Sequence, residues 1–188
     1  MSWDTLQLGK VCYFENGDRG KNYPSKKHYV AEGVPFITAT NVEGGKILNN
    51  LNYISESRYR ILSGGKFKRG DFLFCLRGSL GKFGYVEENL NGGIASSMVI
   101  VRAKNELIDK WLYFYFLSNI CACEIENFKG GAAQPNLGAK DLKKFKIPIP
   151  PTSEQKQIVA TLDKAFATID TAKANAEQNL QNTKELFE

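Results

Sequence analysis

The spacing of apolar residues changes at a proline-rich segment, residues 146–151, and predicts a different structure on each side. Three prolines among the last four residues of this segment exclude it from a helix interior and from a central strand. No glycine or proline follows, and Thr152 with Gln155 fits a capping box at a helix start. Apolar residues then recur at alternating spacings of three and four, which predicts one helix over 152–188, about 54 Å long.

The apolar stripe of this helix is a heptad pattern with polar interruptions at Lys173 and Thr183. A helix longer than a small domain is wide cannot bury such a stripe on its own domain, so we expect a partner helix to cover it. A tail helix that folds back on the rest of the chain is the alternative. The residues predicted to form the helix interface are Val159, Leu162, Phe166, Ile169, Ala176, Leu180 and Phe187.

Residues 1–151 show shorter patterns that favour strands. Apolar runs bounded by turns and glycines predict strands over 33–42 and 71–76, and 84–86 is expected to return beside the second as a hairpin. The strongest strand pattern is the β-branched run at 97–102. These runs indicate a sheet-containing domain before the proline-rich segment.

A long apolar run from 107 to about 127 predicts one buried helix in the same domain. Its aromatic residues are expected in the core, and a platform on which bases stack is the less favoured interpretation. The patterns together predict an α+β fold: a mixed α/β domain over 1–151, followed by one long C-terminal helix over 152–188. The stripe expected to face the core is Leu112, Phe116, Ile120, Cys123 and Phe128.

The amino-acid composition indicates a buried core and an uneven distribution of charge. The chain has 188 residues, of which 43% are hydrophobic and 12% aromatic, which is enough for a buried core and excludes disorder for most of the chain. Of the formal net charge of +5, residues 1–150 carry +7 and residues 151–188 carry −2. A basic domain suits a polyanionic partner, and a mildly acidic helix suits a protein.

Several function classes lack the residues they need. With one histidine and four scattered cysteines that form no C-x-x-C pair, we expect no metal site, no cofactor and few nucleophilic arrangements. The cysteines are expected to be reduced and mostly buried. No phosphate-binding loop of the G-x-x-x-x-G-K-[ST] type occurs. Without a signal peptide or a membrane-length apolar run, the expected location is the cytoplasm.

Basic and polar residues gather in turn-rich loops of the predicted domain. A reader of duplex DNA needs Lys and Arg for phosphates and directional side chains for base edges. Glycines beside such residues let the backbone approach DNA closely. The candidate DNA-binding residues are Arg19, Lys21, Lys26, Lys27, Thr38, Thr40, Asn41, Lys66, Lys68, Arg69, Arg77, Ser79, Lys82, Gln134 and Asn136.

Each of these candidates also has a structural interpretation. The lysines are equally compatible with ordinary solvated charges, and Arg77, after an apolar strand, with an internal ion pair. Gln134 and Asn136 could contact adenine, but hydrogen bonds within their own glycine-rich loop are the favoured interpretation. For the polar residues at 38–41 the two interpretations remain open.

The order of motifs carries a resemblance to a known family. Pro35-Phe36-Ile37 and Gly70-Asp71-Phe72-Leu73 precede the Arg77-Gly78-Ser79-Leu80-Gly81-Lys82 loop. Gly130-Gly131-Ala132-Ala133-Gln134-Pro135-Asn136-Leu137 follows, and Ile147-Pro148-Ile149-Pro150-Pro151 leads through Glu154-Gln155 into the long helix. Over essentially its whole length the chain resembles one half of the specificity subunit of a type I restriction–modification system.

The resemblance implies a target recognition domain and a helical spacer that read one half of a bipartite duplex DNA target without chemistry of their own. It implies partners as well: two methyltransferase subunits, restriction subunits that join through the complex, and a second unit whose helix packs antiparallel. The chain has one unit, so it is either a half subunit that forms a homodimer or the first half of a longer protein. The uncapped helix pattern at its end favours the second.

Two other functions compete with this interpretation. A coiled-coil adaptor with non-specific DNA affinity would explain the helix but not the basic domain with its glycine-framed loops. A DNA-modifying enzyme is less favoured still. An adenine methyltransferase would need a glycine-rich cofactor loop and an Asn-Pro-Pro-Tyr-like string, and the sequence contains neither.

Overall fold

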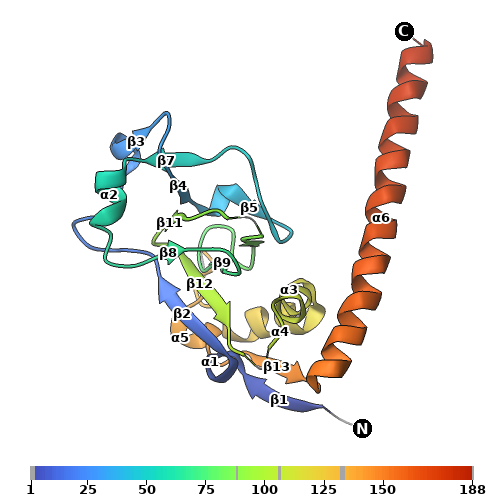
Figure 1. Cartoon of the computed structure of the whole chain (residues 1–188), viewed down its shortest axis with the longest axis horizontal. Coiled ribbons are helices and arrows are strands. Elements are labelled where there is room, and N and C mark those ends of the chain that lie inside the picture. Colours follow the sequence, from blue (N-terminus) through green and yellow to red (C-terminus); the bar gives the residue numbers. More distant parts are fainter. Residues whose placement is uncertain (1–2, 88, 106, 132–133, 188) are drawn as a thin grey trace. The chain divides into compact units, whose positions relative to one another are not determined.

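The computed structural model describes residues 3–87, 89–105, 107–131 and 134–187. The chain divides into two compact units, Met1–Pro150, called the body below, and Pro151–Glu188. Each unit is described by itself. The body contains the strands and short helices, and the second unit is the single helix α6 (Figure 1).

A four-stranded antiparallel sheet forms one half of the body, in the order β10-β9-β12-β2. Strand β12 is central because its apolar run, Met98 to Val101, is buried on both faces of the sheet. It pairs with both neighbours, so segments far apart in the sequence meet here. The strands are β2 (Cys12–Asn16), β9 (Phe72–Cys75), β10 (Phe83–Tyr85) and β12 (Met98–Ala103).

A five-stranded sheet forms the other half, in the order β3-β7-β4-β11-β8. Only the β11–β4 pair is parallel. A Cβ atom at Gly92 would lie 2.2 Å from the carbonyl oxygen of Pro35, so glycine is what permits the close approach of these two segments. The strands are β3 (Tyr29–Val30), β4 (Val34–Ile37), β7 (Asn52–Ile54), β8 (Lys66–Phe67) and β11 (Gly92–Ile94).

Two small sheets complete the body. β5 (Val42–Glu43) pairs with β6 (Lys46–Ile47). β1 (Asp4–Gln7) pairs antiparallel with β13 (Lys146–Ile149), so the first and last strands of the body lie side by side (Figure 1).

Short helices cover and connect the sheets. The Phe116 ring of α3 lies 5.6, 5.2 and 5.3 Å from those of Phe72, Phe74 and Phe83 in the four-stranded sheet, which forms an aromatic core. The helices and 3-10 turns of the body are α1 (Leu8–Val11), η1 (Lys26–His28), η2 (Ala39–Asn41), α2 (Glu56–Arg60), α3 (Asp109–Leu117), α4 (Asn119–Phe128) and α5 (Ala139–Leu142).

Helix α6 spans Thr152–Phe187, 36 residues without a break, as the spacing predicts. No described helix is both long and apolar enough to cross a membrane. The α+β prediction is confirmed, and so are the strands expected near 71–76, 84–86 and 97–102. The strand expected over 33–42 is confirmed only as β4, because the chain then turns through η2 before β5 begins. The hairpin is confirmed too, because β10 pairs antiparallel with β9.

The single helix predicted over 107–127 is wrong, because the chain forms α3 and α4 with a break at Ser118. Ser118 has an extended backbone, and its Oγ accepts a hydrogen bond from the Cys121 backbone N–H at 3.3 Å, which begins a new helix. The break turns two residues of the predicted stripe outward, whereas Phe128 still stacks on the buried Phe145. Ile120 is 50% exposed and Cys123 is exposed.

The other three cysteines are buried, and burial raises the pKa of Cys12, Cys75 and Cys121 to about 12. These thiols are therefore protonated at neutral pH. Among the described residues no group of three or more His, Cys, Asp or Glu side chains is placed to hold a metal ion.

Candidate nucleic-acid interface

Basic and amide side chains from separate segments surround one groove of the body, of about 530 Å³. It lies where β2 and β9 end and where the glycine-rich loop before α5 returns. We call it the Arg77 groove. Its lining residues are Asn16, Arg19, Arg77, Asn136, Leu137, Gly138, Ala139, Lys140 and Asp141.

Arg77 follows β9 in a tight loop. Gly78 and Gly81 have φ angles of 79° and 83°, in the left-handed region that glycine adopts readily, so the chain turns back within a few residues. Arg77 is exposed, and no carboxylate among the described residues forms an ion pair with it. The internal ion pair considered for Arg77 is therefore not present in the described structure.

The glycine-rich loop is hydrogen-bonded to the segment directly after β9 that carries Arg77. The backbone N–H of Leu137 donates to the Leu76 carbonyl at 2.9 Å, and Asn136 is opposite Arg77 in an antiparallel bridge. Gly130 and Asn136 exchange backbone hydrogen bonds of 2.8 and 2.9 Å, which close the loop. Asn136 thus lines the groove, and exposed Gln134 lies in the same loop.

Arg19 is brought to the groove by its neighbour Asp18, which is only 5% exposed. The Asp18 carboxylate accepts hydrogen bonds from the Ser63 N–H at 2.9 Å, the Ser63 hydroxyl at 3.0 Å and the Gly20 N–H at 2.7 Å. The hydrogen bonds from the backbones of Ser63 and Gly20 are the main reason that the pKa of Asp18 is lowered. The carboxylate therefore anchors the loop.

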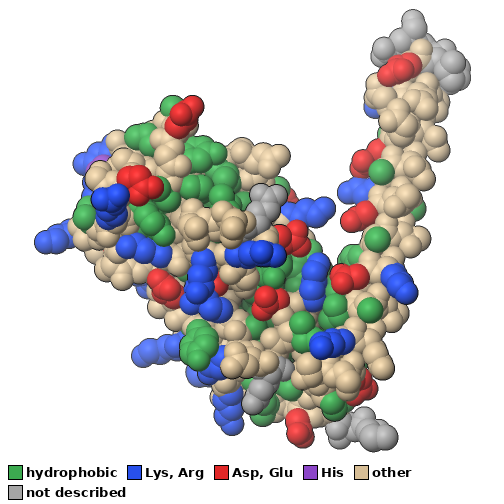
Figure 2. All heavy atoms as spheres, in the orientation of Figure 1, with side chains coloured by type: hydrophobic (Ala, Val, Ile, Leu, Met, Phe, Trp, Pro, Cys, Tyr) green, Lys and Arg blue, Asp and Glu red, His purple; other side chains and the backbone are tan. Residues whose placement is uncertain are grey.

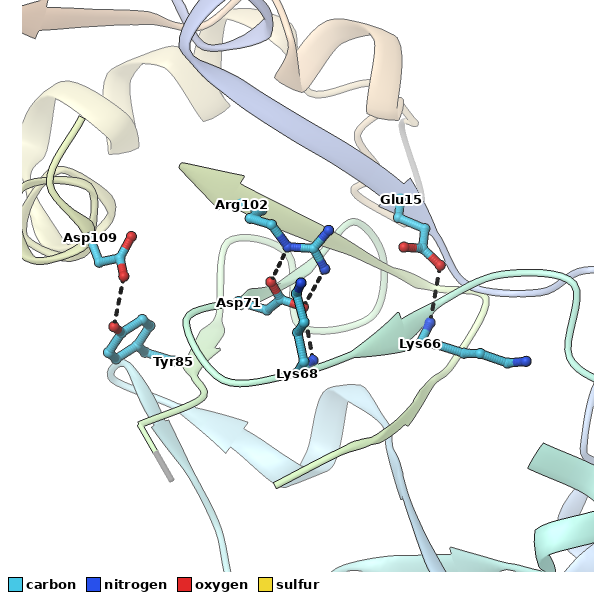
Figure 3. A network of polar contacts seen from close by, with 7 residues as sticks. All are labelled: Glu15, Lys66, Lys68, Asp71, Tyr85, Arg102 and Asp109. Carbon is cyan, nitrogen blue, oxygen red and sulfur yellow. Dashed lines mark hydrogen bonds and ion pairs between the residues drawn. The ribbon is translucent and has the colours of Figure 1, made fainter. Parts of the chain in front are cut away.

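The basic turn at 66–69 is held by acidic residues through its backbone (Figure 3). Glu15 Oε1 accepts from the N–H groups of Gly65 and Lys66 at 2.7 and 3.1 Å, and Asp71 Oδ2 accepts from the Lys68 N–H at 2.9 Å. Because these bonds use backbone donors, the turn keeps its shape without neutralising its lysine side chains.

Asp71 is fully buried and needs a charged partner. The guanidinium of Arg102 supplies it with a two-pronged ion pair, Nε to Oδ1 at 2.6 Å and Nη2 to Oδ2 at 2.8 Å (Figure 3). The hydrogen bond to Asp71 also raises the pKa of Arg102. Asp71 and Arg102 thus form a charged core beneath the basic turn.

Several predicted residues are engaged elsewhere. Lys82 pairs with Glu43 at 2.7 Å. The Lys66 ammonium donates to the Arg60 carbonyl at 3.2 Å and lies 5.2 Å from the centre of the Tyr59 ring. These contacts leave the two lysines less available to a polyanion than Arg77.

Asn41 must be removed from the candidate DNA-binding residues, because it is 1% exposed. Its Oδ1 accepts from the Thr38 N–H at 2.8 Å and from the Thr38 hydroxyl at 2.7 Å, while its Nδ2 donates to the Asn50 carbonyl at 2.8 Å. The side chain forms the capping box of η2. Thr40 is exposed and shares a 2.9 Å hydrogen bond with the Thr38 hydroxyl.

The structure brings Arg19, Arg77 and Asn136 together in one groove, with Ser79 and Gln134 in the same loops. It does not place Lys26 and Lys27, which lie in η1, or the 38–40 segment among the groove residues. Lys21, Lys68 and Arg69 are exposed outside the groove. Figure 2 shows Lys and Arg side chains over several elements of the body, and hydrophobic side chains gathered near β4 and β7.

Sequence reasoning missed Asn16 and Lys140 as groove residues. Asn16 is the last residue of β2, and Lys140 lies in α5, four positions after Asn136. The position of Lys140 just beyond the glycine-rich loop was the available signal, whereas nothing local distinguishes Asn16.

On α6, the predicted stripe includes large apolar residues at the surface. Phe166 is 43% exposed, Ile169 60% and Leu180 59%, and Ala176 is also exposed. Val159 is buried and Leu162 half-buried. The side chain of Phe187 lies outside the described part of the chain.

Comparison with known proteins places the chain in a family. The family model "Type I restriction modification DNA specificity domain" matches residues 1–182. The EcoBI type I restriction enzyme specificity subunit of Escherichia coli is 26% identical over 143 residues, which are 75% of this chain and 30% of that protein.

Solved structures share the fold. The HsdS subunit of Thermoanaerobacter tengcongensis superposes with a TM-score of 0.66 at 25% identity, over 90% of this chain and 39% of that one. A chain from a structure of the assembly and conformational transition of the type I R-M system gives a TM-score of 0.72 at 24% identity, over 96% of this chain and 43% of that one. The present chain thus spans less than half the length of each of these relatives. It belongs to the family of type I restriction modification DNA specificity domains.

Proposed function

We propose that the chain reads one half of a bipartite duplex DNA target as the recognition module of a type I restriction–modification system. The Arg77 groove carries this proposal. It collects Arg19, Arg77 and Lys140 with two asparagines, and its one carboxylate, Asp141, is 2.7 Å from the Lys144 ammonium. A groove rich in cations whose acid is paired elsewhere suits a polyanion with base edges to read.

The side chains of the groove suit different parts of a duplex. The planar fork of Arg77 can donate two hydrogen bonds to guanine O6 and N7, and the amide of Asn136 can pair with adenine N6 and N7. Arg19 and Lys140 suit phosphates, which position a protein on DNA without reading its sequence. Thr40, Ser79 and Gln134 remain candidates for further polar contacts.

The two predicted domains take separate roles in this proposal. Residues 1–151 bind DNA, and residues 152–188 pair with the helix of a second unit, either another copy of the chain or the other half of a longer subunit. Methyltransferase subunits dock on this assembly and restriction subunits join through it, in the cytoplasm, without a cofactor bound to this chain. The family match favours recognition over the adaptor and the enzyme considered from the sequence.

The direct test is co-purification of the chain with the methyltransferase subunit of its own system, followed by methylation of a random-sequence duplex pool. We expect a complex that methylates only duplexes sharing one motif. Methylation without a shared motif would contradict sequence recognition. A chain that forms no complex and binds no duplex at low salt would leave the coiled-coil adaptor as the better account.

A further inference from the structure

A second basic groove, of about 450 Å³, lies on other elements of the body. Its walls are η1 with β3 on one side, and the end of β7 with α2 on the other. We call it the His28 groove, and it shares no residue with the Arg77 groove. Its lining residues are Lys27, His28, Tyr29, Val30, Ser55, Ser57, Arg58 and Ile61.

The positive charge of this groove is not neutralised within the described structure. No carboxylate lines it, and neither Lys27 nor Arg58 forms an ion pair with a described residue. Glu56, the acid closest in sequence, has its Oε2 3.9 Å from Arg60 Nε. Partial burial, and then the charges of Arg58 and Lys27, lower the pKa of His28. An anion in the groove would relieve this repulsion.

The donors of the groove are held by local hydrogen bonds. The Ser25 N–H donates to His28 Nδ1 at 3.1 Å, so the neutral ring carries its proton on Nε2. Across the groove, the Ser55 hydroxyl accepts from the Arg58 N–H at 3.3 Å and contacts the Ser57 hydroxyl at 3.0 Å. These bonds orient the imidazole of His28 and fix the backbone of Arg58 at the opposite wall.

We propose that the His28 groove binds a backbone phosphate of the same duplex whose bases meet the Arg77 groove, a contact that rests on the DNA recognition proposed above. An Arg fork, a Lys charge and serine hydroxyls are the groups that bind phosphate oxygens. The groove is open to solvent, so a polymer backbone can pass through it. Because the ligand proposed here is a phosphate and not a base, the contact tightens binding regardless of sequence.

The imidazole of His28 makes this contact sensitive to pH. Lys27 on its own turn and Arg58 on α2 line the groove beside His28, and burial raises the pKa of Tyr29 on β3, so its phenol stays neutral. His28 is therefore the group of the groove that titrates between pH 5 and 8. A bound phosphate raises the pKa of His28, and affinity increases as pH falls through the value in the complex.

The only histidine of the chain gives one imidazole signal for NMR. We would titrate the full chain with pH, alone and with a short random-sequence duplex, while fluorescence anisotropy confirms binding. The midpoint of the His28 titration should rise by about one pH unit when DNA binds. Inorganic phosphate at the same phosphate concentration should leave the midpoint unmoved, because a free ion lacks the other contacts of the duplex. An unmoved midpoint with DNA bound would overturn the proposal.

A matched pair of variants on α2 separates a groove contact from a change in net charge. Arg58→Ala should weaken binding to random duplex about tenfold at low salt and reduce the slope of log K against log salt by about one. Arg60→Ala removes the same charge outside the groove and should change neither. Equal losses of duplex affinity in the Arg58 and Arg60 variants would also overturn the proposed phosphate contact. A parent chain that binds no duplex at low salt would contradict the proposed function itself.

Discussion

The body and helix α6 are ordered by different kinds of contact. In the body, strands distant in the sequence pair, as β12 does with β2 and β9. In α6, side-chain bonds join residues four apart, such as Gln178 Nε2 to Asn182 Oδ1 and Gln181 Nε2 to Glu185 Oε1, both at 2.8 Å. Local bonds shape a helix but stabilise it little without packing. The body therefore presents a surface fixed by its own core, whereas α6 presents exposed apolar residues such as Ile169 and Leu180.

The largest expected effect is on the pairing of α6. Ile169→Asp with Leu180→Asp places two charges on side chains that are 60% and 59% exposed in this chain. If a partner helix covers them, each side chain contributes about 1.5–3 kcal/mol, so the double change should raise the dissociation constant at least a hundredfold. Light scattering after size-exclusion chromatography at several concentrations measures this.

The control for helix pairing carries the same two charges on the opposite face of the helix, with Thr171→Asp and Gln178→Asp. These positions lie five residues after stripe positions, and both residues are exposed. The control should assemble like the parent chain. A parent that remains monomeric, or a stripe variant that assembles normally, would contradict helix pairing.

Loss of the buried charge pair should destabilise the body alone. Asp71→Ala leaves the Arg102 guanidinium without its partner and the Lys68 N–H without its acceptor, so the free energy of unfolding should fall by about 3–5 kcal/mol. Urea unfolding followed by fluorescence reports on the body, because both tryptophans, Trp3 and Trp111, lie in it. Asp141→Ala breaks only an exposed pair and should change stability by less than about 1 kcal/mol. Equal losses of stability in the two variants would contradict a stabilising role of the buried Asp71–Arg102 pair.

A smaller effect is expected on DNA binding. Arg77→Ala should weaken binding to a duplex carrying the methylated motif by about 1–3 kcal/mol, with much less effect on random duplex, if Arg77 contacts a base. Lys26→Ala removes an exposed charge outside both grooves and should show no such preference. Unchanged affinity of the Arg77 variant for the motif would remove Arg77 from the base contacts.

The smallest effect concerns the break between α3 and α4. Ser118→Ala removes the hydroxyl that accepts from the Cys121 N–H and donates to the Tyr115 carbonyl, which should lower the stability of the body by about 1 kcal/mol. The same change at exposed Ser153 on α6 should leave the body unaffected. A Ser118 variant as stable as the parent would show that packing alone sets the break.

Local patterns predicted α6 and the main strands, because heptad spacing and β-branched runs specify these elements directly. The same local view failed at Ser118, where one hydroxyl in an apolar run starts a second helix. It also misjudged Asn41, although Thr38 and Asn41 three positions apart fit a capping arrangement that the structure contains.

The groove could not be assembled from the sequence. Arg77 was selected because it stands alone between an apolar strand and a glycine, but the register that sets Asn136 opposite it depends on long-range pairing. Lys140 and Asn16 join them only once β2, β9 and α5 have been placed. Residue type thus indicated the chemistry of the site, and the tertiary fold determined which residues come together in the groove.

The pairing of β1 with β13 has a consequence for how such a module can change. Because Asp4 lies opposite Ile149, the polypeptide enters and leaves the body at a single point. The residues between these strands can therefore be exchanged as one cassette that keeps the pairing of its two ends. If the body reads DNA as proposed, replacing this cassette would change the target preference and leave the residues of α6 unaltered.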